Sequence, residues 1–205
     1  DVTTTKQAPV SAMLQHSVAS VIGTHPLFGP DVHSMQGQRI AITPGRLHAS
    51  HDWLSWMRGM FSAAGMILLE TTSEEHDRVM AIVQVLTHFS TEVIGHALKA
   101  LDVSIEETLR FTSPIYHMEL LMTARHFAQS ADLYSAIQMA NPNTEEVISA
   151  FRNAADACSK MVSDRDDAAF RKAFEEVRDY FGPFAEQAMQ ESSHLIDRLV
   201  ERGRI

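Results

Sequence analysis

The spacing of hydrophobic residues changes character near residue 71. Before this point, short apolar runs predict strands at 20–24, 39–43 and 66–69. Between the second and third strands, apolar residues at helical spacing predict a helix over 51–64. The order strand, helix, strand is typical of the last part of an α/β sheet.

After residue 71 the pattern is helical almost without interruption. From Val79 to Leu101 the apolar positions recur at intervals of three and four, which predicts one helix with a wide apolar face. Capping-box pairs predict three helix starts, at Thr72 with Glu75, Ser104 with Glu107, and Asn143 with Glu146. Gly182-Pro183 predicts a break in the last long helical stretch, because proline cannot continue the hydrogen-bond ladder.

These patterns predict a mainly α protein with a small α/β part. We expect one domain over 1–70, the end of an α/β sheet, and an all-helical domain over 71–205. Asp1 and Val2 resemble the end of another strand. An α/β sheet needs neighbours for that strand, and the 205 residues offer few. We therefore expect upstream residues, or another molecule, to complete the sheet.

Composition narrows the classes of protein that fit. Hydrophobic residues make up 45% and charged residues 21%, an ordinary balance for a globular protein. No apolar run approaches the roughly 18 residues that span a bilayer, and the N-terminal residues lack the apolar core of a signal peptide. The single cysteine, Cys158, rules out an internal disulfide and fits a reducing compartment. We expect a cytoplasmic protein that does not associate with membranes.

Charge and histidine spacing exclude two further kinds of site. The net charge of -9 argues against a nucleic-acid partner, although a small anion can still bind in a locally positive pocket. His48 and His51 have no carboxylate or cysteine at ligand spacing. His76 and His88 lie on one helical stripe with Met80 and Gln84, but about 18 Å of helix separates the two histidines. We predict no metal site.

The segment from Gly23 to Asp31 is the most distinctive local feature. Pro26 favours an extended backbone at His25, and Gly29-Pro30 turns the chain just beyond. This places an imidazole at the carboxyl end of a strand, where open α/β sheets bind ligands. Such a histidine can accept a proton near neutral pH. The alternative is an ordinary surface-loop histidine.

Two further segments carry groups that can bind or orient a ligand. In Thr3-Thr4-Thr5-Lys6 a hydroxyl could orient an imidazole or a substrate alcohol, and the lysine could neutralise an anion. The alternative there is a helix N-cap beside a solvated lysine. Arg125 lies in an apolar helix, where it either forms a salt bridge with Glu119 or another carboxylate, or captures a ligand carboxylate.

Taken together, these segments resemble the prephenate dehydrogenases, particularly those fused to chorismate mutase in enteric-type bacteria. The matching stretches are 1–6, 23–31, Glu75-His76-Asp77 with Gln84 and His88-Phe89, Ser113-Pro114-Ile115-Tyr116, and Arg125 with Phe127-Ala128-Gln129. They follow in register nearly from end to end of the chain. The resemblance implies that 1–70 is the end of the nucleotide-binding sheet with the catalytic histidine loop, and that 71–205 is the substrate-binding and dimerisation domain.

The resemblance also implies a reaction, the oxidative decarboxylation of prephenate to 4-hydroxyphenylpyruvate in tyrosine biosynthesis. His25 would accept the proton of the ring hydroxyl as a hydride leaves for NAD or NADP. Thr4 stands where the family usually has serine, and its hydroxyl would hold the substrate oxygen and orient His25. Lys6 matches a lysine that supports the active site.

Four further residues would bind the substrate by the same resemblance. Arg125 would pair with the ring carboxylate, and His88 matches a histidine tied to substrate binding and to inhibition by tyrosine. His117 stands where close relatives often carry arginine, and Tyr134 matches an aromatic residue near the pocket. The implied partners are prephenate, tyrosine as a feedback inhibitor, and a second copy of the chain.

The cofactor segment of the family is not among these 205 residues. No Gly-x-Gly-x-x-Gly turn occurs, and it belongs roughly 80 to 100 residues upstream. We therefore interpret the chain as a truncated form that is inactive alone, with its cofactor-binding residues unknown. The alternative is a non-catalytic, dimeric regulatory domain that binds tyrosine or another aromatic acid.

Overall fold

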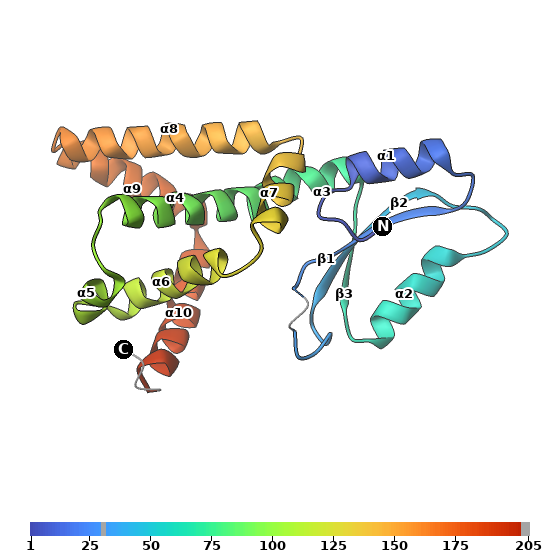
Figure 1. Cartoon of the computed structure of the whole chain (residues 1–205), viewed down its shortest axis with the longest axis horizontal. Coiled ribbons are helices and arrows are strands. Elements are labelled where there is room, and N and C mark those ends of the chain that lie inside the picture. Colours follow the sequence, from blue (N-terminus) through green and yellow to red (C-terminus); the bar gives the residue numbers. More distant parts are fainter. Residues whose placement is uncertain (30–31, 202–205) are drawn as a thin grey trace. The chain divides into compact units, whose positions relative to one another are not determined.

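The computed structural model describes residues 1–29 and 32–201 (Figure 1). Pro30 and Asp31, which end the segment beginning at Gly23, lie outside the described residues. The strands are β1 (Val21–Pro26), β2 (Arg39–Arg46) and β3 (Ile67–Glu70). The helices are α1 (Gln7–His16), α2 (Trp53–Ala63), α3 (Ser73–Met80), the π-helix η1 (Ala81–Leu86), α4 (Thr87–Ala100), α5 (Ile105–Arg110), α6 (Pro114–Phe127), α7 (Ala131–Ala140), α8 (Thr144–Ser163), α9 (Asp167–Phe181) and α10 (Pro183–Glu201).

The chain divides into two compact units, and each is described by itself. The first unit contains Asp1–Thr87 and Asp132–Val147, and the second contains His88–Ala131 and Ile148–Ile205. The boundary predicted at residue 71 follows the change from strands to helices, whereas these units are defined by packing, so that boundary stays a prediction about domains. The predicted fold class, mainly helical with a small α/β part, is confirmed.

The first unit is built on a three-stranded mixed sheet in the order β1-β2-β3. β2 and β3 run parallel and are connected through α2, as the strand-helix-strand pattern predicted. β1 pairs antiparallel with β2, and His25 lies opposite Ala41 in this register. The central strand supplies much of the core, since Ile40 and Ile42 are fully buried.

The residues before α1 do not form the strand that their sequence suggested. Asp1 and Val2 lie in irregular backbone. The Asp1 carbonyl accepts a hydrogen bond from the Thr24 amide on β1, with 2.8 Å between nitrogen and oxygen. One such bond anchors this segment beside β1 but does not make the repeating ladder that defines a strand.

Helices α1 and α3 determine what surrounds His25. α1 packs on β1 and β2 through its buried residue Val10, and α3 packs on both α1 and β2. The segment before α1, the end of β1 and the buried face of α3 therefore meet. This arrangement brings together Lys6, His25, His76 and Asp77, all of which are buried.

The long helix predicted from Val79 to Leu101 contains a change of helical type. α3 continues into the six-residue π-helix η1 and then into α4. Ala81 and Val85 are fully buried within η1, whereas Ile82 and Val83 are exposed. Only part of the wide apolar face predicted from the sequence is therefore buried. Short π-helical segments are frequent at functional sites.

The helix signals read from the sequence are largely confirmed. The Thr72 hydroxyl accepts a hydrogen bond from the Glu75 amide at 3.1 Å, and Ser104 accepts from Glu107 at 3.1 Å. Gly182 separates α9 from α10 with a φ of 53°, in the left-handed region that favours glycine. None of the helices in the described part of the chain is long and apolar enough to cross a membrane.

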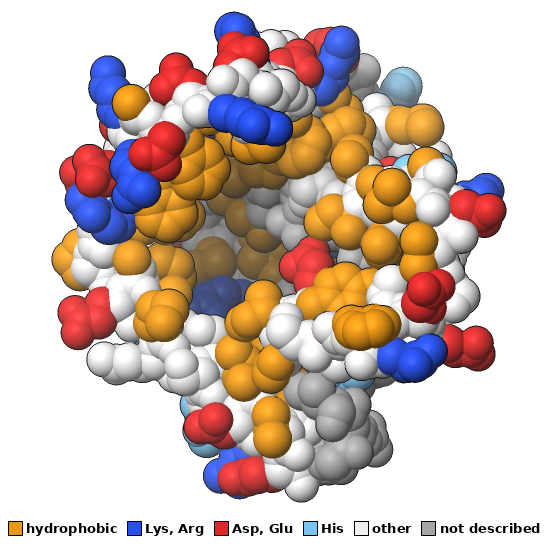
Figure 2. Space-filling view, turned by 90° about the vertical axis from the view of Figure 1, so that its left-hand side faces the viewer, with side chains coloured by type: hydrophobic (Ala, Val, Ile, Leu, Met, Phe, Trp, Pro, Cys, Tyr) orange, Lys and Arg blue, Asp and Glu red, His pale blue; other side chains and the backbone are white. Residues whose placement is uncertain are grey.

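The second unit consists of helices, and much of its apolar surface is exposed. The Phe89 and Phe151 rings join α4 to α8, with 5.4 Å between their centroids, and α6 packs against α10. Neither α8, α9 nor α10 has a buried residue, although each is amphipathic. Figure 2 shows hydrophobic side chains gathered around a hollow on one face of the molecule.

Candidate functional site

His25 occupies the next-to-last position of β1 and is only 4% exposed. This exposure excludes the alternative of a surface-loop histidine. Its Nδ1 lies 2.9 Å from Nε2 of His76 on α3, and its Nε2 lies 3.5 Å from the Gln84 amide nitrogen on η1. The imidazole is therefore held by hydrogen-bonding side chains from two consecutive helical segments.

His76 connects His25 to a buried carboxylate. Its Nδ1 lies 2.8 Å from Oδ1 of Asp77, and His76 and Asp77 are 3% and 0% exposed. The two imidazole rings meet edge to face, with centroids 5.1 Å apart and an interplanar angle of 64°. The three side chains form one continuous hydrogen-bonded chain, His25–His76–Asp77.

The Asp77 carboxylate also orients the start of α1. Oδ1 accepts a hydrogen bond from the Lys6 amide at 2.7 Å, and Oδ2 accepts from the Gln7 amide at 2.9 Å. Burial by itself raises the pKa of Asp77, but the hydrogen bonds from His76, Gln7 and Lys6 outweigh burial and hold the pKa below its usual value. Asp77 is therefore ionised at neutral pH.

Asn141 ties this arrangement to the segment after α7. Its side-chain amide donates to the Asp77 carbonyl at 2.8 Å, and its own Oδ1 accepts from the Asn143 amide at 2.9 Å. Asn141 is 64 residues from Asp77 in sequence and is itself buried. Position 77 is thus fixed through its backbone as well as through its carboxylate.

Lys6 is fully buried, contrary to the alternative of a solvated lysine. Its ammonium forms an ion pair with Asp1 and donates to the Thr24 carbonyl at 2.7 Å. Burial lowers the pKa of Lys6 to about 8, although the negative charge of Asp77 opposes this shift. Lys6 therefore supports the backbone immediately before His25 while remaining mostly protonated at neutral pH.

Thr4 is not brought to His25 in the way the sequence suggested. Thr4 is half-buried, and among the described residues its hydroxyl forms no hydrogen bond with His25. Nδ1 of the imidazole is directed to His76 instead. The nearby Thr3 hydroxyl donates to the Thr5 carbonyl at 2.8 Å, so it stabilises the local turn.

The electrostatic surroundings keep His25 neutral. Burial, with further contributions from His76 and Lys6, lowers the pKa of His25 to about 4, while Asp77 acts in the opposite direction. At pH 7 the imidazole therefore has one nitrogen with a hydrogen and one with a free lone pair. Such a group can accept a proton from a hydroxyl placed beside it.

Tyr134, the fourth predicted substrate-binding residue, also belongs to the first unit. It lies on α7 and is buried. His88, His117 and Arg125 belong to the second unit. Arg125 is exposed on α6, so the cost of burying its charge does not arise, and it forms no ion pair with Glu119 or another carboxylate of the described residues.

His88 belongs to a small histidine cluster in the second unit. Its ring centroid lies 5.5 Å from that of His126, and His126 Nε2 lies 3.2 Å from the Glu92 carboxylate. Burial and His126 lower the pKa of His88. His117 lies elsewhere on α6, and its buried Nδ1 has no hydrogen-bond partner among the described residues. Both remain predicted substrate-binding residues.

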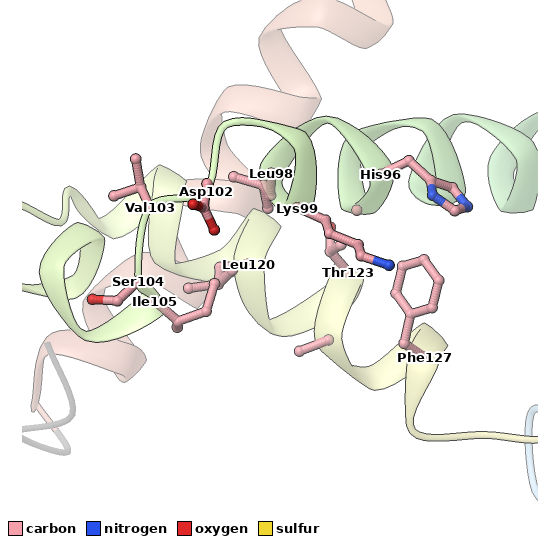
Figure 3. Close-up of a pocket in the computed structure, with 12 residues that line it drawn as sticks. His96, Leu98, Lys99, Asp102, Val103, Ser104, Ile105, Leu120, Thr123 and Phe127 are labelled. Carbon is pink, nitrogen blue, oxygen red and sulfur yellow. The ribbon is translucent and has the colours of Figure 1, made fainter.

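The second unit also contains an apolar pocket of about 690 Å³ between α4, α5 and α6 (Figure 3). Leu98, Leu120 and Phe127 supply apolar walls, and Lys99 extends toward the Phe127 ring (Figure 3). A side chain at Gly95 would collide with that ring at 2.2 Å, so this glycine allows Phe127 to lie against α4. The pocket is one part of the exposed apolar surface of this unit.

Sequence reasoning missed the principal partners of His25. His76 and Gln84 were identified only as members of a helical stripe and of a family motif, and Asp77 only as a member of that motif. That stripe was the available signal, because it placed His76 and Gln84 on one face. Among residues 1–29 and 32–201, no group of three His, Cys, Asp or Glu side chains is arranged to hold a metal ion.

Similar proteins of known sequence support one family. The chain is 34% identical over 198 residues to a probable arogenate/prephenate dehydrogenase of Methanocaldococcus jannaschii, covering 96% of this chain and 44% of that protein. It is also 34% identical over 198 residues to the T-protein of Haemophilus influenzae, covering 97% of this chain and 52% of that protein. The chain thus spans about half the length of the curated relatives it matches.

Solved structures share the fold at lower sequence identity. Synechocystis arogenate dehydrogenase aligns with a TM-score of 0.67 and 16% identity, over 88% of this chain and 68% of that chain. Prephenate dehydrogenase from Aquifex aeolicus, in complex with hydroxyphenyl propionate and NAD+, aligns with a TM-score of 0.66 and 17% identity, over 91% and 64% of the two chains. These likenesses establish the fold.

A family model agrees with both comparisons. The model described as prephenate dehydrogenase, dimerization domain, matches residues 72–176. This range is slightly more than half of the chain and includes α3, which carries His76 and Asp77. The resemblance seen in the sequence is confirmed, and the chain belongs to the prephenate dehydrogenase family.

Proposed function

We propose that this chain supplies the catalytic base and the substrate-binding residues of a dehydrogenase that oxidatively decarboxylates prephenate to 4-hydroxyphenylpyruvate. The observation that carries the proposal is His25, a buried neutral imidazole at the end of β1 that is hydrogen-bonded through Nδ1. Relatives that include an arogenate/prephenate dehydrogenase support the substrate class. The activity belongs to the complete protein, because the chain spans about half of those relatives.

The proposed role of His25 follows from the chemistry of alcohol oxidation. When a hydride leaves the carbon that bears the hydroxyl, the oxygen becomes strongly acidic, and a base that takes its proton lowers the barrier. His25 Nε2 is the proposed base, and Gln84 beside it can hydrogen-bond to the same ligand oxygen. Lys6 supports the site by fixing the Thr24 carbonyl, and Thr4 remains a proposed contact of the substrate oxygen.

Arg125 is proposed to bind the ring carboxylate of the substrate. Its exposed guanidinium has no ion-pair partner in the described part of the chain and can receive a carboxylate through two parallel hydrogen bonds. His88, His117 and Tyr134 are proposed to contact the remainder of the substrate. Tyrosine, whose para-hydroxylated ring and carboxylate resemble those of the product 4-hydroxyphenylpyruvate, is the proposed inhibitor.

Gly23 leaves no room beside its backbone for a dinucleotide phosphate. Gly23 lies three residues before the end of β1, and a Cβ there would meet Thr43 at 2.4 Å and Val10 at 2.8 Å. Its missing side chain therefore accommodates protein packing and not a phosphate. We propose that NAD or NADP is held by other residues of the complete protein. This chain contributes proton transfer and substrate binding.

The second unit is proposed to form a homodimer. The family model that matches residues 72–176 is that of a dimerization domain. On α9, the exposed residues Phe170, Phe174, Val177 and Phe181 recur at helical spacing and form an apolar stripe without buried members. A second copy of the chain would cover such a stripe and remove it from water.

The test of the proposed function is turnover by the complete protein. Prephenate and arogenate are each offered with NAD and with NADP, to the wild type and to His25→Asn. We expect turnover of at least one pair, and a loss of about 1000-fold or more in His25→Asn. His16→Asn, at an exposed histidine of α1, is the matched control and retains activity. A complete protein that binds tyrosine but turns over neither substrate would identify a regulatory domain instead.

A further inference from the structure

The buried chain His25–His76–Asp77 has a direction that fixes where each proton lies. Asp77 is ionised, and an ionised carboxylate can only accept hydrogen bonds. The hydrogen between Asp77 and His76 therefore belongs to Nδ1 of His76. When that is the only hydrogen on the His76 ring, Nε2, the atom that faces His25 at 2.9 Å, presents a lone pair.

This lone pair determines the tautomer of His25. His25 is neutral, so it carries one ring hydrogen, and the acceptor on His76 places that hydrogen on Nδ1. The free lone pair of His25 is consequently on Nε2, the atom beside Gln84. The opposite tautomer would bring two lone pairs to face each other across a buried contact, which is costly.

The same geometry offers a second site for positive charge. Once His25 Nε2 has taken up a proton, His25 would carry a positive charge if it also kept its Nδ1 hydrogen. That charge would lie on a buried imidazole and be repelled by the Lys6 ammonium. If the Nδ1 proton moves to His76, the charge lies instead on the ring that contacts the Asp77 carboxylate at 2.8 Å. Attraction between opposite charges in a buried site favours the second arrangement.

We propose that His76 and Asp77 are positioning residues for the catalytic base: they hold His25 with its hydrogen on Nδ1, and His76 receives that hydrogen when Nε2 takes the substrate proton. The inference rests on the proposed function. The O–H bond of the substrate breaks and an N–H bond forms at His25 Nε2. The Nδ1–H bond of His25 breaks, an N–H bond forms at His76 Nε2, and one positive charge ends on His76 beside Asp77. The nicotinamide of the proposed reaction accepts the hydride.

The charged groups near the two histidines are the Lys6 ammonium and the Asp77 carboxylate. Asp1 is a third, because its carboxylate pairs with Lys6. Lys6 lies before α1, Asp77 is on α3, and Gln84 on η1 is uncharged. Lys6, whose pKa is about 8, stays mostly protonated below pH 7, and the pKa of Asp77 is held below its usual value, so neither is expected to change charge in the mildly acidic range. Acid inactivation in this range would therefore report the pair.

The test uses the complete protein and the substitution His76→Gln. Glutamine places an acceptor oxygen near the former Nε2, so it can keep the Nδ1 hydrogen on His25, but it cannot take on a proton. We expect kcat to fall about 100-fold with KM changed less than about threefold. The acid limb of the kcat/KM profile should move to lower pH, because His25 must then carry the charge alone. His16→Gln is the matched control at an exposed histidine and should leave both parameters unchanged.

A purely structural role for His76 would lower the fraction of active protein without moving the acid limb. An unmoved limb in folded His76→Gln, while His25→Asn is inactive, would overturn the relay and leave the proposed function standing. A wild type without turnover would instead refute the proposed function itself.

A measurement on the wild type avoids reliance on the variant. Nitrogen NMR of labelled histidines, assigned by comparison with His25→Asn, distinguishes a protonated from an unprotonated ring nitrogen. Above the acid limb, we expect His25 to carry its hydrogen on Nδ1 and to lack one on Nε2. A hydrogen on Nε2 would overturn the proposal, whether or not His76→Gln folds.

Discussion

The ammonium of Lys6 donates a hydrogen bond to the carbonyl of Thr24, the residue directly before His25, at 2.7 Å. Lys6 is fully buried, and its other charged partner is Asp1, which is also nearly buried. A lysine in such a position is held by its acceptors, and its loss leaves them without a partner. The backbone that carries the proposed base therefore depends on a residue 18 positions earlier.

Replacing Lys6 by methionine tests this dependence. The Asp1 carboxylate and the Thr24 carbonyl would lose their shared donor, and breaking a buried ion pair from one side costs about 3–5 kcal/mol. We expect the free energy of unfolding, measured by urea denaturation, to fall by about this amount. Lys160→Met, at an exposed ion pair, should change it by less than about 0.5 kcal/mol. Equal effects of the two substitutions would contradict the structural role of Lys6.

Gly23 tests how tightly the strand end is packed. A Cβ at this position would meet the Thr43 hydroxyl, Val10 and the side chain of Lys6 at 2.4, 2.8 and 3.1 Å. Gly23→Ala should therefore destabilise the chain by about 1–3 kcal/mol. Gly59→Ala is the matched control on α2, where nothing lies within 4 Å of the added carbon, and it should stabilise by about 0.5–1 kcal/mol. We expect the two substitutions to change the free energy of unfolding in opposite directions, as measured by thermal or urea unfolding. A Gly23→Ala variant of unchanged stability would show that the packing around β1 can relax.

The histidine at the site should make stability depend on pH. Burial lowers the pKa of His25 to about 4, whereas in the unfolded chain it titrates near 6.5. Between these pH values the unfolded state binds the extra proton, so this part of the stability is complete above about pH 6.5 and is lost as pH falls through 4. We expect a loss of about 2–4 kcal/mol over this window, measured by urea unfolding at successive pH values. His25→Gln should flatten that slope and His16→Gln should not.

The sequence predicted local structure well and the contacts of the site less well. Strand β1, the N-cap at Thr72 and the break at Gly182 were all readable, because each depends on residues close together in the chain. The Asp77–Asn141 hydrogen bond spans 64 residues and had no local signal. Periodicity shows which side chains share a face of a helix but not which surface that face meets.

Two errors about exposure have the same origin. Lys6 was weighed as a solvated lysine, and Arg125 as a buried arginine whose charge needs an anionic partner, yet the structure buries the first and exposes the second. Neighbouring residue types suggested the opposite in both cases. Burial is decided by how α1 and α6 pack within their units, and one helix alone does not contain that information.

Arg125 offers a test of substrate binding apart from proton transfer. Arg125→Ala in the complete protein should raise KM for prephenate about 10- to 100-fold, because it removes a charge-assisted hydrogen bond to a carboxylate. The KM of Arg125→Lys should fall between those of the wild type and Arg125→Ala, since lysine keeps the charge without the bidentate geometry. Arg152→Ala, at an exposed arginine of α8, is the control for a general loss of positive charge. An Arg125→Ala enzyme with unchanged KM would remove this residue from the proposed substrate contacts.

The apolar stripe of α9 provides the test of assembly. Phe174 is 65% exposed at the middle of the stripe, and a glutamate there would place a charge where a second copy is proposed to pack. We expect Phe174→Glu to weaken the dimer at least about 100-fold, seen as a shift toward monomer in sedimentation equilibrium. Lys172→Glu, an exposed charge on the same helix, should leave the dimer intact. A wild type that sediments as a monomer at all concentrations would refute the dimer. An unaffected Phe174→Glu dimer would instead place the interface on another face of the helical unit, such as the apolar residues of α10.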